Sequence, residues 1–273
     1  MNIEISSGLS KLQELTEVSY VLFLILPFQK FLKFWLAKSP ETIIEINNIK
    51  LAIRARNIFA KISDISMAYE CILRDDYNLK TLKLPQKSTV IDIGAHIGSF
   101  SLGAASKFRQ SRIFCFEPSP SNYLILKKNI ELNNSKNIFA SNKAVTSNGE
   151  KVKIYISSVN SAANSIYAPK KNFIEAQSIT LERIFNSNKI KKCDFLKMDC
   201  EGAEYDIILN APIWILSKIG IMVIEYHNPE YIGIKINEYT LNNLVRKLEK
   251  SGFNCQIKQS KIYQGIIFAK KRQ

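Results

Sequence analysis

The spacing of apolar residues becomes regular at about residue 88 and stays regular to the C-terminus. Short runs rich in β-branched residues alternate there with longer segments in which apolar residues recur at helical intervals. Buried strands are expected at 89–93, 112–116, 194–198 and 221–225. Helices are expected at 98–108, at 121–132, from residue 203 and at 241–250. This alternation predicts an α/β fold around a mostly parallel sheet with right-handed crossovers.

The remaining segments complete this outline. Further strands are expected at 137–144 and 151–156, and the last two, at 253–258 and 262–269, are close enough to form an antiparallel hairpin. Residues before about Pro85 are predicted to be mainly helical, with short strands near 42–53. We therefore divide the chain into an accessory segment, 1–84, and a catalytic domain, 85–273.

An apolar stretch at 18–36 is interrupted by Pro27, Gln29, Lys30 and Lys33. It is too short and too broken to predict a bilayer span. We expect it to pack on the catalytic domain or to lie at a membrane surface. No basic region precedes it, so no signal peptide is expected. These features predict a cytoplasmic protein with a possible peripheral contact at the inner membrane face.

Composition narrows the class of protein. The net charge of +14 would suit a nucleic-acid partner, but the lysines are scattered rather than clustered, so such a partner is not expected. The five cysteines are odd in number and form no C-x-x-C pair, which argues against a disulfide framework and against zinc. No spacing of ligand residues predicts another metal. The oligomeric state is left open.

Two of the predicted strands end in residues suited to a nucleoside cofactor. In the segment 92–98, Gly94 allows a sharp turn close to a ligand, and Gly98 opens a helix whose amides can face an anion. Glu117 follows the next strand, where a carboxylate can accept both hydroxyl hydrogens of a ribose. Because ligands of parallel sheets bind beyond the carboxyl ends of the strands, these residues predict an adenosine-containing cofactor.

Acidic residues and a histidine follow the other two predicted strands. Asp199, Glu201 and Glu204 come after one, and Glu225 and His227 come at the end of the next. The acids could cap the following helix instead, and His227 could be a hydrogen-bonded loop residue. Lys197 is charged although it lies within a strand, so it either pairs with an acid or contacts a substrate.

The chain from about Arg54 onward resembles the FkbM family of methyltransferases. The matching segments are 90–98, 116–119, 142–145 and, most telling, 194–204, which is close to the family block K-x-D-x-E-G-x-E. Glu182 departs from the aspartate that is usual in the family. The resemblance implies a Rossmann-like methyltransferase fold with an antiparallel strand inserted at one edge of the sheet. It also implies S-adenosyl-L-methionine as cofactor and, usually, O-methylation.

Together, the residues and the resemblance give a set of expected site residues. The cofactor residues are expected to be Asp92, Gly94, Ala95, His96, Gly98, Glu117, Pro118, Ala144 and Asp199. The catalytic residues are expected to be His227, Asp199, Glu201, Lys197 and Glu225. We expect His227, supported by Asp199 or Glu201, to act as the base that removes a hydroxyl proton, since imidazole is suited to proton transfer near neutral pH.

The expected acceptor is a hydroxyl of a sugar, a glycan or a glycosylated intermediate. One alternative is N-methylation of RNA or protein. Enzymes that N-methylate RNA often carry Asn/Asp-Pro-Pro-aromatic after the fourth strand, where this chain has Asp-Cys-Glu-Gly at 199–202. The other alternative is a binding protein that holds the cofactor without catalysis. The intact Gly94, Gly98 and Glu117 argue against it.

Overall fold

The computed structural model describes residues 39–55, 58–155, 165–166, 172–261 and 263–272. The apolar stretch at 18–36 lies outside the described residues. The strands are β1 (Glu41–Ile46), β2 (Ile49–Arg54), β3 (Thr89–Ile93), β4 (Arg112–Phe116), β5 (Ile138–Ser141), β6 (Ala144–Val145), β7 (Val152–Tyr155), β8 (Phe173–Ala176), β9 (Ser178–Ile179), β10 (Cys193–Met198), β11 (Ile219–His227), β12 (Phe253–Lys261) and β13 (Gln264–Lys271). The helices are α3 (Ile58–Ala68), the π-helical turn η1 (Tyr69–Arg74), α4 (Ser99–Lys107), α5 (Pro120–Leu132), α6 (Leu181–Ser187), α7 (Ala203–Asn210), α8 (Ile213–Leu216) and α9 (Leu241–Lys250).

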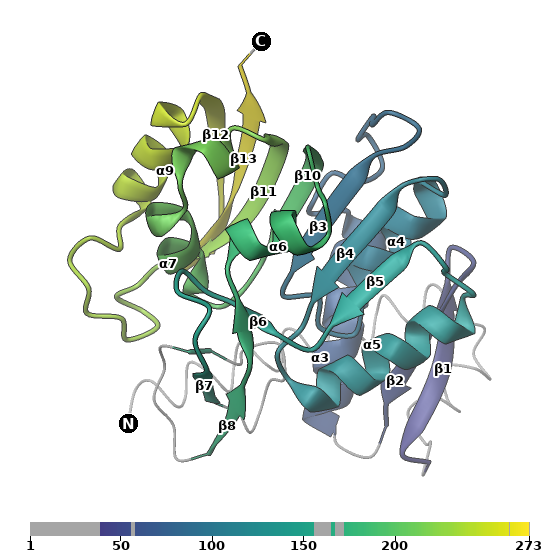
Figure 1. The fold of residues 1–273 in the computed structure, drawn as a ribbon. Coiled ribbons are helices and arrows are strands. Elements are labelled where there is room, and N and C mark those ends of the chain that lie inside the picture. The colour runs from purple at the N-terminus through teal and green to yellow at the C-terminus, as the bar shows by residue number, and fades with distance from the viewer. Residues whose placement is uncertain (1–38, 56–57, 156–164, 167–171, 262, 273) are drawn as a thin grey trace.

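The central sheet is mixed, with strand order β12-β13-β11-β10-β3-β4-β5 among the described residues. Its five strands from β11 to β5 are parallel, and β13 pairs antiparallel with both β11 and β12. Figure 1 shows this sheet running through the molecule with helices on both faces. The predicted α/β class, the Rossmann-like, mostly parallel sheet and the C-terminal antiparallel hairpin are confirmed.

Alternate residues of the strands build one core on each face of the sheet. Val90 and Phe195 lie in a cluster with residues of β1, β2, α3, α4 and α5. Their strand neighbours Ile91 and Leu196 lie in a second cluster with residues of α6, α7, α8 and α9. Because both faces are covered, the strands are mainly apolar, as their sequences indicated.

The predicted strand at 137–144 is two strands in the structure. The chain leaves the sheet at Asn142, whose side-chain Nδ2 donates to the carbonyls of Glu117 and Pro118 at 2.8 and 3.0 Å. Beyond this point β6 pairs in parallel with β9, away from the main sheet. The hairpin β7–β8 lies beside it (Figure 1). These short elements border the site described below.

The described part of the predicted accessory segment packs tightly on the domain. Strands β1 and β2 form an antiparallel hairpin. Asn129 of α5 connects this hairpin to the loop before α4, because it accepts the Ala52 N–H at 2.6 Å and donates to the Ile97 carbonyl at 2.9 Å. The strands predicted near 42–53 are therefore present. The division of the chain at residue 84 stays a prediction. Among the helices that the structure describes, none is long and apolar enough to cross a membrane.

Candidate active site

Four parallel strands bring the sequence motifs to one edge of the sheet. Ile93 of β3 pairs with Phe116 of β4 on one side and with Met198 of β10 on the other, and Met198 pairs with Ile224 of β11. The residues that follow these strand ends are therefore neighbours in space. The cofactor motifs and the acid–histidine motifs meet at the same edge, as the strand-end rule predicts.

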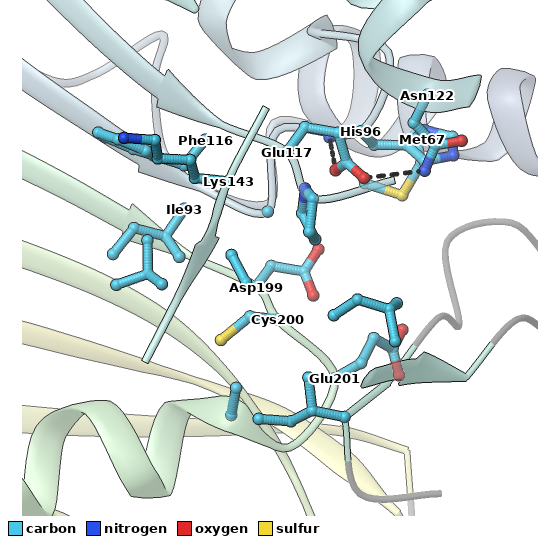
Figure 2. Close-up of a pocket in the computed structure, with 17 residues that line it drawn as sticks. Met67, Ile93, His96, Phe116, Glu117, Asn122, Lys143, Asp199, Cys200 and Glu201 are labelled. Atoms are coloured by element: carbon cyan, nitrogen blue, oxygen red, sulfur yellow. Dashed lines mark hydrogen bonds between the residues drawn. The ribbon is translucent and has the colours of Figure 1, made fainter. Parts of the chain in front are cut away.

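A cleft opens at this edge, and its two sides carry different chemistry. Figure 2 shows Glu117, Asn122 and His96 on one side, with Asp199 and Glu201 across from them. The full lining is Met67, Ile93, Gly94, His96, Phe116, Glu117, Pro118, Asn122, Lys143, Ala144, Val145, Ile154, Ile166, Asp199, Cys200, Glu201 and Ala203.

Glu117 is fixed by three protein donors. Its Oε1 accepts from the Ser119 N–H at 2.9 Å. Oε1 also accepts from Asn122 Nδ2 at 3.2 Å, and Oε2 accepts from the His96 N–H at 2.8 Å (Figure 2). The side chain is 5% exposed. Burial raises the pKa of Glu117 above its ordinary value, although these hydrogen bonds work in the opposite direction. The carboxylate is thus oriented before any ligand arrives.

Gly94 and Asp199 approach each other so closely that only glycine fits. Gly94 has a φ of +77°, and a Cβ added there would lie 1.7 Å from the carbonyl oxygen of Asp199. The Asp199 N–H in turn donates to the Ile93 carbonyl at 3.0 Å. The turn on the cofactor side and the first acid on the other side are therefore locked together.

Lys197 lies beneath this contact and is 1% exposed. Its Nζ donates to the Gly94 carbonyl at 2.8 Å and lies 3.4 Å from Asp92 and 3.7 Å from Asp199. Asp92 also accepts a hydrogen bond from Ser101 of α4 at 2.6 Å. Lys197 therefore supports the loop between β3 and α4 and does not border the cleft.

His227 ends β11 and faces a ring of carboxylates. Its Nδ1 lies 3.2 Å from Oε1 of Glu204, and its Nε2 lies 3.5 Å from Glu201 and 4.0 Å from Glu225. Burial works to lower the pKa of His227, but Glu201 and Glu204 together outweigh it and hold the pKa well above its ordinary value. Glu204 is one of the acids that could cap the following helix. Besides contacting His227, it accepts the Gly202 N–H at the start of α7 through Oε2 at 2.8 Å.

Tyr77 also belongs to the site, although it was not among the expected site residues. Its hydroxyl lies 3.2 Å from Oδ2 of Asp199 and 3.1 Å from Oε2 of Glu225, and the residue is 1% exposed. Gln264 of β13 donates to the other oxygen of Glu225 at 2.8 Å. Burial raises the pKa of Glu225 to about 8. Tyr77 lies in the upstream part of the family resemblance, but nothing in its local sequence signals this role.

His96 is buried on the other side of the cleft. Its Nε2 lies 3.3 Å from the guanidinium of Arg54, which pairs with the fully buried Asp64 of α3. Burial lowers the pKa of His96 well below its ordinary value, and the Arg54 charge adds to this effect. The ring is therefore neutral near pH 7, and His96 shapes the loop that follows β3.

Some of the expected site residues border the cleft, and others do not. Among the expected cofactor residues, those that border it are Gly94, His96, Glu117, Pro118, Ala144 and Asp199. Asp92 lies in β3, and Ala95 and Gly98 lie in the loop that follows it; all three are buried and do not border the cleft. Among the expected catalytic residues, Asp199 and Glu201 border the cleft. His227 and Glu225 lie behind them.

The family of the chain follows from its sequence as a whole. The family described as "Methyltransferase FkbM domain" matches residues 92–255, which is more than half of the chain. The chain belongs to the FkbM methyltransferase family. As an FkbM methyltransferase it uses S-adenosyl-L-methionine as its methyl donor. The cleft fits such a donor, because a fixed buried carboxylate, Glu117, and apolar side chains such as Phe116 and Val145 line one continuous space.

The individual proteins that resemble this chain match it over a short stretch or at low sequence identity. Methyltransferase sdnD of Sordaria araneosa is 38% identical over 60 residues, which cover 22% of this chain and 23% of the relative. Methyltransferase 1 of Beauveria bassiana is 24% identical over 145 residues, which cover 45% of this chain and 58% of the relative. The matches thus span less than two thirds of either relative. A further match is the crystal structure of methyltransferase FkbM from Methylobacillus flagellatus, with 13% sequence identity and a TM-score of 0.46. The match covers 78% of this FkbM chain and 55% of the Methylobacillus flagellatus chain.

Proposed function

We propose that this methyltransferase O-methylates a hydroxyl of a sugar, a glycan or a glycosylated intermediate. The observation that carries the proposal is a cluster of three side chains beside the cofactor cleft. One ligating atom from each of Asp199, Glu201 and His227 lies within 4.8 Å of the other two. Carboxylates that face a cleft accept hydrogen bonds from hydroxyl groups, and several together suit an acceptor with more than one hydroxyl.

The two sides of the cleft divide the work in this proposal. On the cofactor side, Glu117 accepts the ribose hydroxyls, with Gly94, Pro118 and Ala144 forming the surrounding wall. S-adenosyl-L-methionine supplies an electrophilic methyl group on a sulfonium. On the acceptor side, the cluster holds the attacking oxygen in line with that methyl group. Such positioning contributes about 7–11 kcal/mol in favourable cases.

An alcohol must also lose its proton as it attacks. The proton passes into the cluster of Asp199, Glu201 and His227, with Glu225 beside it. The ring of His227 is oriented by Glu204 so that Nε2 faces this space. Proton transfer to a placed group contributes roughly 10²–10⁴-fold to the rate. Lys197 acts indirectly in this scheme, by supporting the Gly94 turn and Asp199.

The test is a transfer assay with an isotope-labelled methyl group, using oligosaccharides, RNA and a protein lysate in parallel. Product analysis by nuclear magnetic resonance separates methyl on oxygen from methyl on nitrogen. We expect labelled O-methyl sugar, and we expect Asp199→Asn and His227→Ala to cut turnover by about 10²-fold while cofactor affinity is retained. Label on nitrogen of RNA or protein would refute the proposal, and binding of the cofactor without transfer to any class would favour a non-catalytic role.

A further inference from the structure

The cluster on the acceptor side has the composition of a metal site. It offers two carboxylates and one imidazole, from the end of β10 and the end of β11. A mixed set of this kind suits first-row divalent cations, which accept both oxygen and nitrogen ligands. The sequence showed no ligand spacing that predicts this, because Asp199 and His227 are far apart in the chain and meet only through the parallel pairing of β10 and β11.

We propose that Asp199, Glu201 and His227 bind one octahedral divalent cation of the Mn²⁺ type, which takes the acceptor hydroxyl as a further ligand. This inference rests on the proposed function, because it names the group through which the acceptor is held. The remaining positions around the cation would face the cleft, which Asp199 and Glu201 both border. Two neighbouring hydroxyls of a sugar can occupy two such positions at once.

The orientation of His227 supports the proposal independently of the acids. The imidazole is 5% exposed, yet its Nε2 lies 3.5 Å from Glu201 and 4.0 Å from Glu225, beyond a normal N–H···O hydrogen bond. Its other nitrogen lies 3.2 Å from the buried carboxylate of Glu204. A histidine that binds a metal through one nitrogen almost always has the other held by a carboxylate or carbonyl. Nε2 therefore faces the cluster, where its neighbours are carboxylates at ion-pair distance.

The surrounding contacts distinguish Asp199 from Glu225 as a ligand. Tyr77 and Lys197 both approach Oδ2 of Asp199, and no hydrogen bond among the described residues reaches Oδ1. Both oxygens of Glu225 are engaged, by Tyr77 and Gln264. Glu225 is thus placed beside the cluster and not within it. Donors on one octahedral cation lie roughly 3 Å apart, so the present separations of up to 4.8 Å would close by rotation of the carboxylates.

The cation would change how the hydroxyl is activated. A hydroxyl beside a divalent cation gives up its proton more easily, because the positive charge favours the oxyanion. As the oxygen attacks, its O–H bond breaks and the proton passes to the carboxylate of Glu225 or to water. The new C–O bond forms as the S–C bond breaks, and the electron pair stays on sulfur. His227 then serves as a ligand, and the base is a carboxylate or water.

The binding test needs no acceptor. The full chain, freed of metal with a chelator, is titrated with Mn²⁺, and the free ion is followed by electron paramagnetic resonance. We expect one bound Mn²⁺ per chain and an affinity at least about 10-fold weaker in Asp199→Asn and in Glu201→Gln. Glu201 is the safer variant, since its side chain is 22% exposed. Glu249→Gln, an exposed acid on α9, is the matched control and should bind as the unaltered chain does.

The outcomes separate the two proposals. Equal Mn²⁺ binding in the chain and in folded Glu201→Gln, or no specific binding at all, would overturn the metal site. So would methyl transfer to a hydroxyl at an unchanged rate after chelation, and in that case the O-methyltransferase assignment stands. Specific Mn²⁺ binding in a chain that methylates only nitrogen would keep the metal site and overturn the proposed acceptor. Circular dichroism and thermal unfolding of each variant show that it is folded.

Discussion

The carboxylate of Glu204 holds His227 at two points. One oxygen accepts the main-chain N–H of His227 at 2.7 Å and lies 3.2 Å from Nδ1 of its ring. The other oxygen accepts the N–H of Gly202, which precedes α7. A single buried side chain therefore couples the start of α7 to the end of β11 and fixes the direction of the imidazole.

Glu204→Gln is expected to lower turnover by roughly 10–100-fold while the dissociation constant for the cofactor stays nearly unchanged. An amide would present N–H groups to donors and turn the ring of His227. Turnover and cofactor binding by calorimetry are the measurements. Asp206→Asn is the control, because Asp206 also lies in the first turn of α7 but accepts its hydrogen bonds from Ser147, away from His227. An equal loss in both variants would mean that helix stability, not ring orientation, is responsible.

Cofactor affinity is expected to depend on pH through Glu117. Only the ionised carboxylate can accept two ribose hydroxyls, and burial raises its pKa above the ordinary 4.5. Affinity should therefore fall as the pH falls, beginning above pH 4.5. Glu117→Gln should weaken binding roughly 10–100-fold at neutral pH and flatten the dependence. Glu131→Gln, an exposed acid on α5, should behave like the unaltered chain, and a pH profile unchanged by Glu117→Gln would place the ribose elsewhere.

Gly94→Ala is expected to destabilise the fold far more than Gly233→Ala. Both glycines have similar positive φ values, +77° and +79°, but an added Cβ at Gly233 meets nothing within 4 Å. Gly233→Ala should cost about 1–2 kcal/mol, which is the left-handed backbone penalty alone. Gly94→Ala adds a collision with the Asp199 carbonyl and should cost roughly 3 kcal/mol or more. Urea unfolding measures both, and equal costs would show that the close approach is not rigid.

Arg54→Ala is expected to destabilise the chain by about 3–5 kcal/mol at neutral pH, because it leaves the buried Asp64 without its cation. Burial raises the pKa of Asp64 above its ordinary 3.8, and Arg54 opposes that rise, so the variant raises the pKa further. The folded variant then binds a proton more tightly than the unfolded chain. Its stability should fall as the pH rises above 3.8, and the gap to the unaltered chain should widen.

Urea unfolding across this pH range checks the expectation. The double variant Arg54→Ala, Asp64→Asn removes the titrating carboxyl and should lose the pH dependence. If the single variant is destabilised equally at all pH values, the ion pair is not what Arg54 contributes.

The sequence predicted the parts of the site that lie at strand ends. Strands such as β3 and β10 are mainly apolar, which marks them as buried. Because they run parallel, the residues that follow the strands, such as Glu117 and Asp199, lie at one edge of the sheet. The departure of the chain from the sheet at Asn142 was not predicted, because it depends on hydrogen bonds to a segment more than twenty residues away. Tyr77 was missed for the same reason. Its partners are Asp199 and Glu225, and only the folded chain brings them together.

Lys197 was found from the sequence, but its role could not be predicted from the sequence. A charge within an apolar strand signals an unusual environment, but the sequence does not say which neighbour satisfies it. In the folded chain the ammonium group of Lys197 supports the loop after β3, because it lies among the Gly94 carbonyl and the carboxylates of Asp92 and Asp199. Residue type and strand position therefore predicted the location of the site well, and the roles of its individual side chains less well.

Tyr77 and Met67 both precede residue 92, where the match to the FkbM family begins, yet one touches Asp199 and the other borders the cleft. The site therefore includes side chains that lie upstream of residues 92–255. Two members could keep identical motifs and still diverge in what they methylate, through changes upstream of the shared domain. Under the proposed function, attempts to redirect the enzyme to a new acceptor should therefore include Tyr77, which contacts Asp199 and Glu225 and does not belong to the cofactor wall.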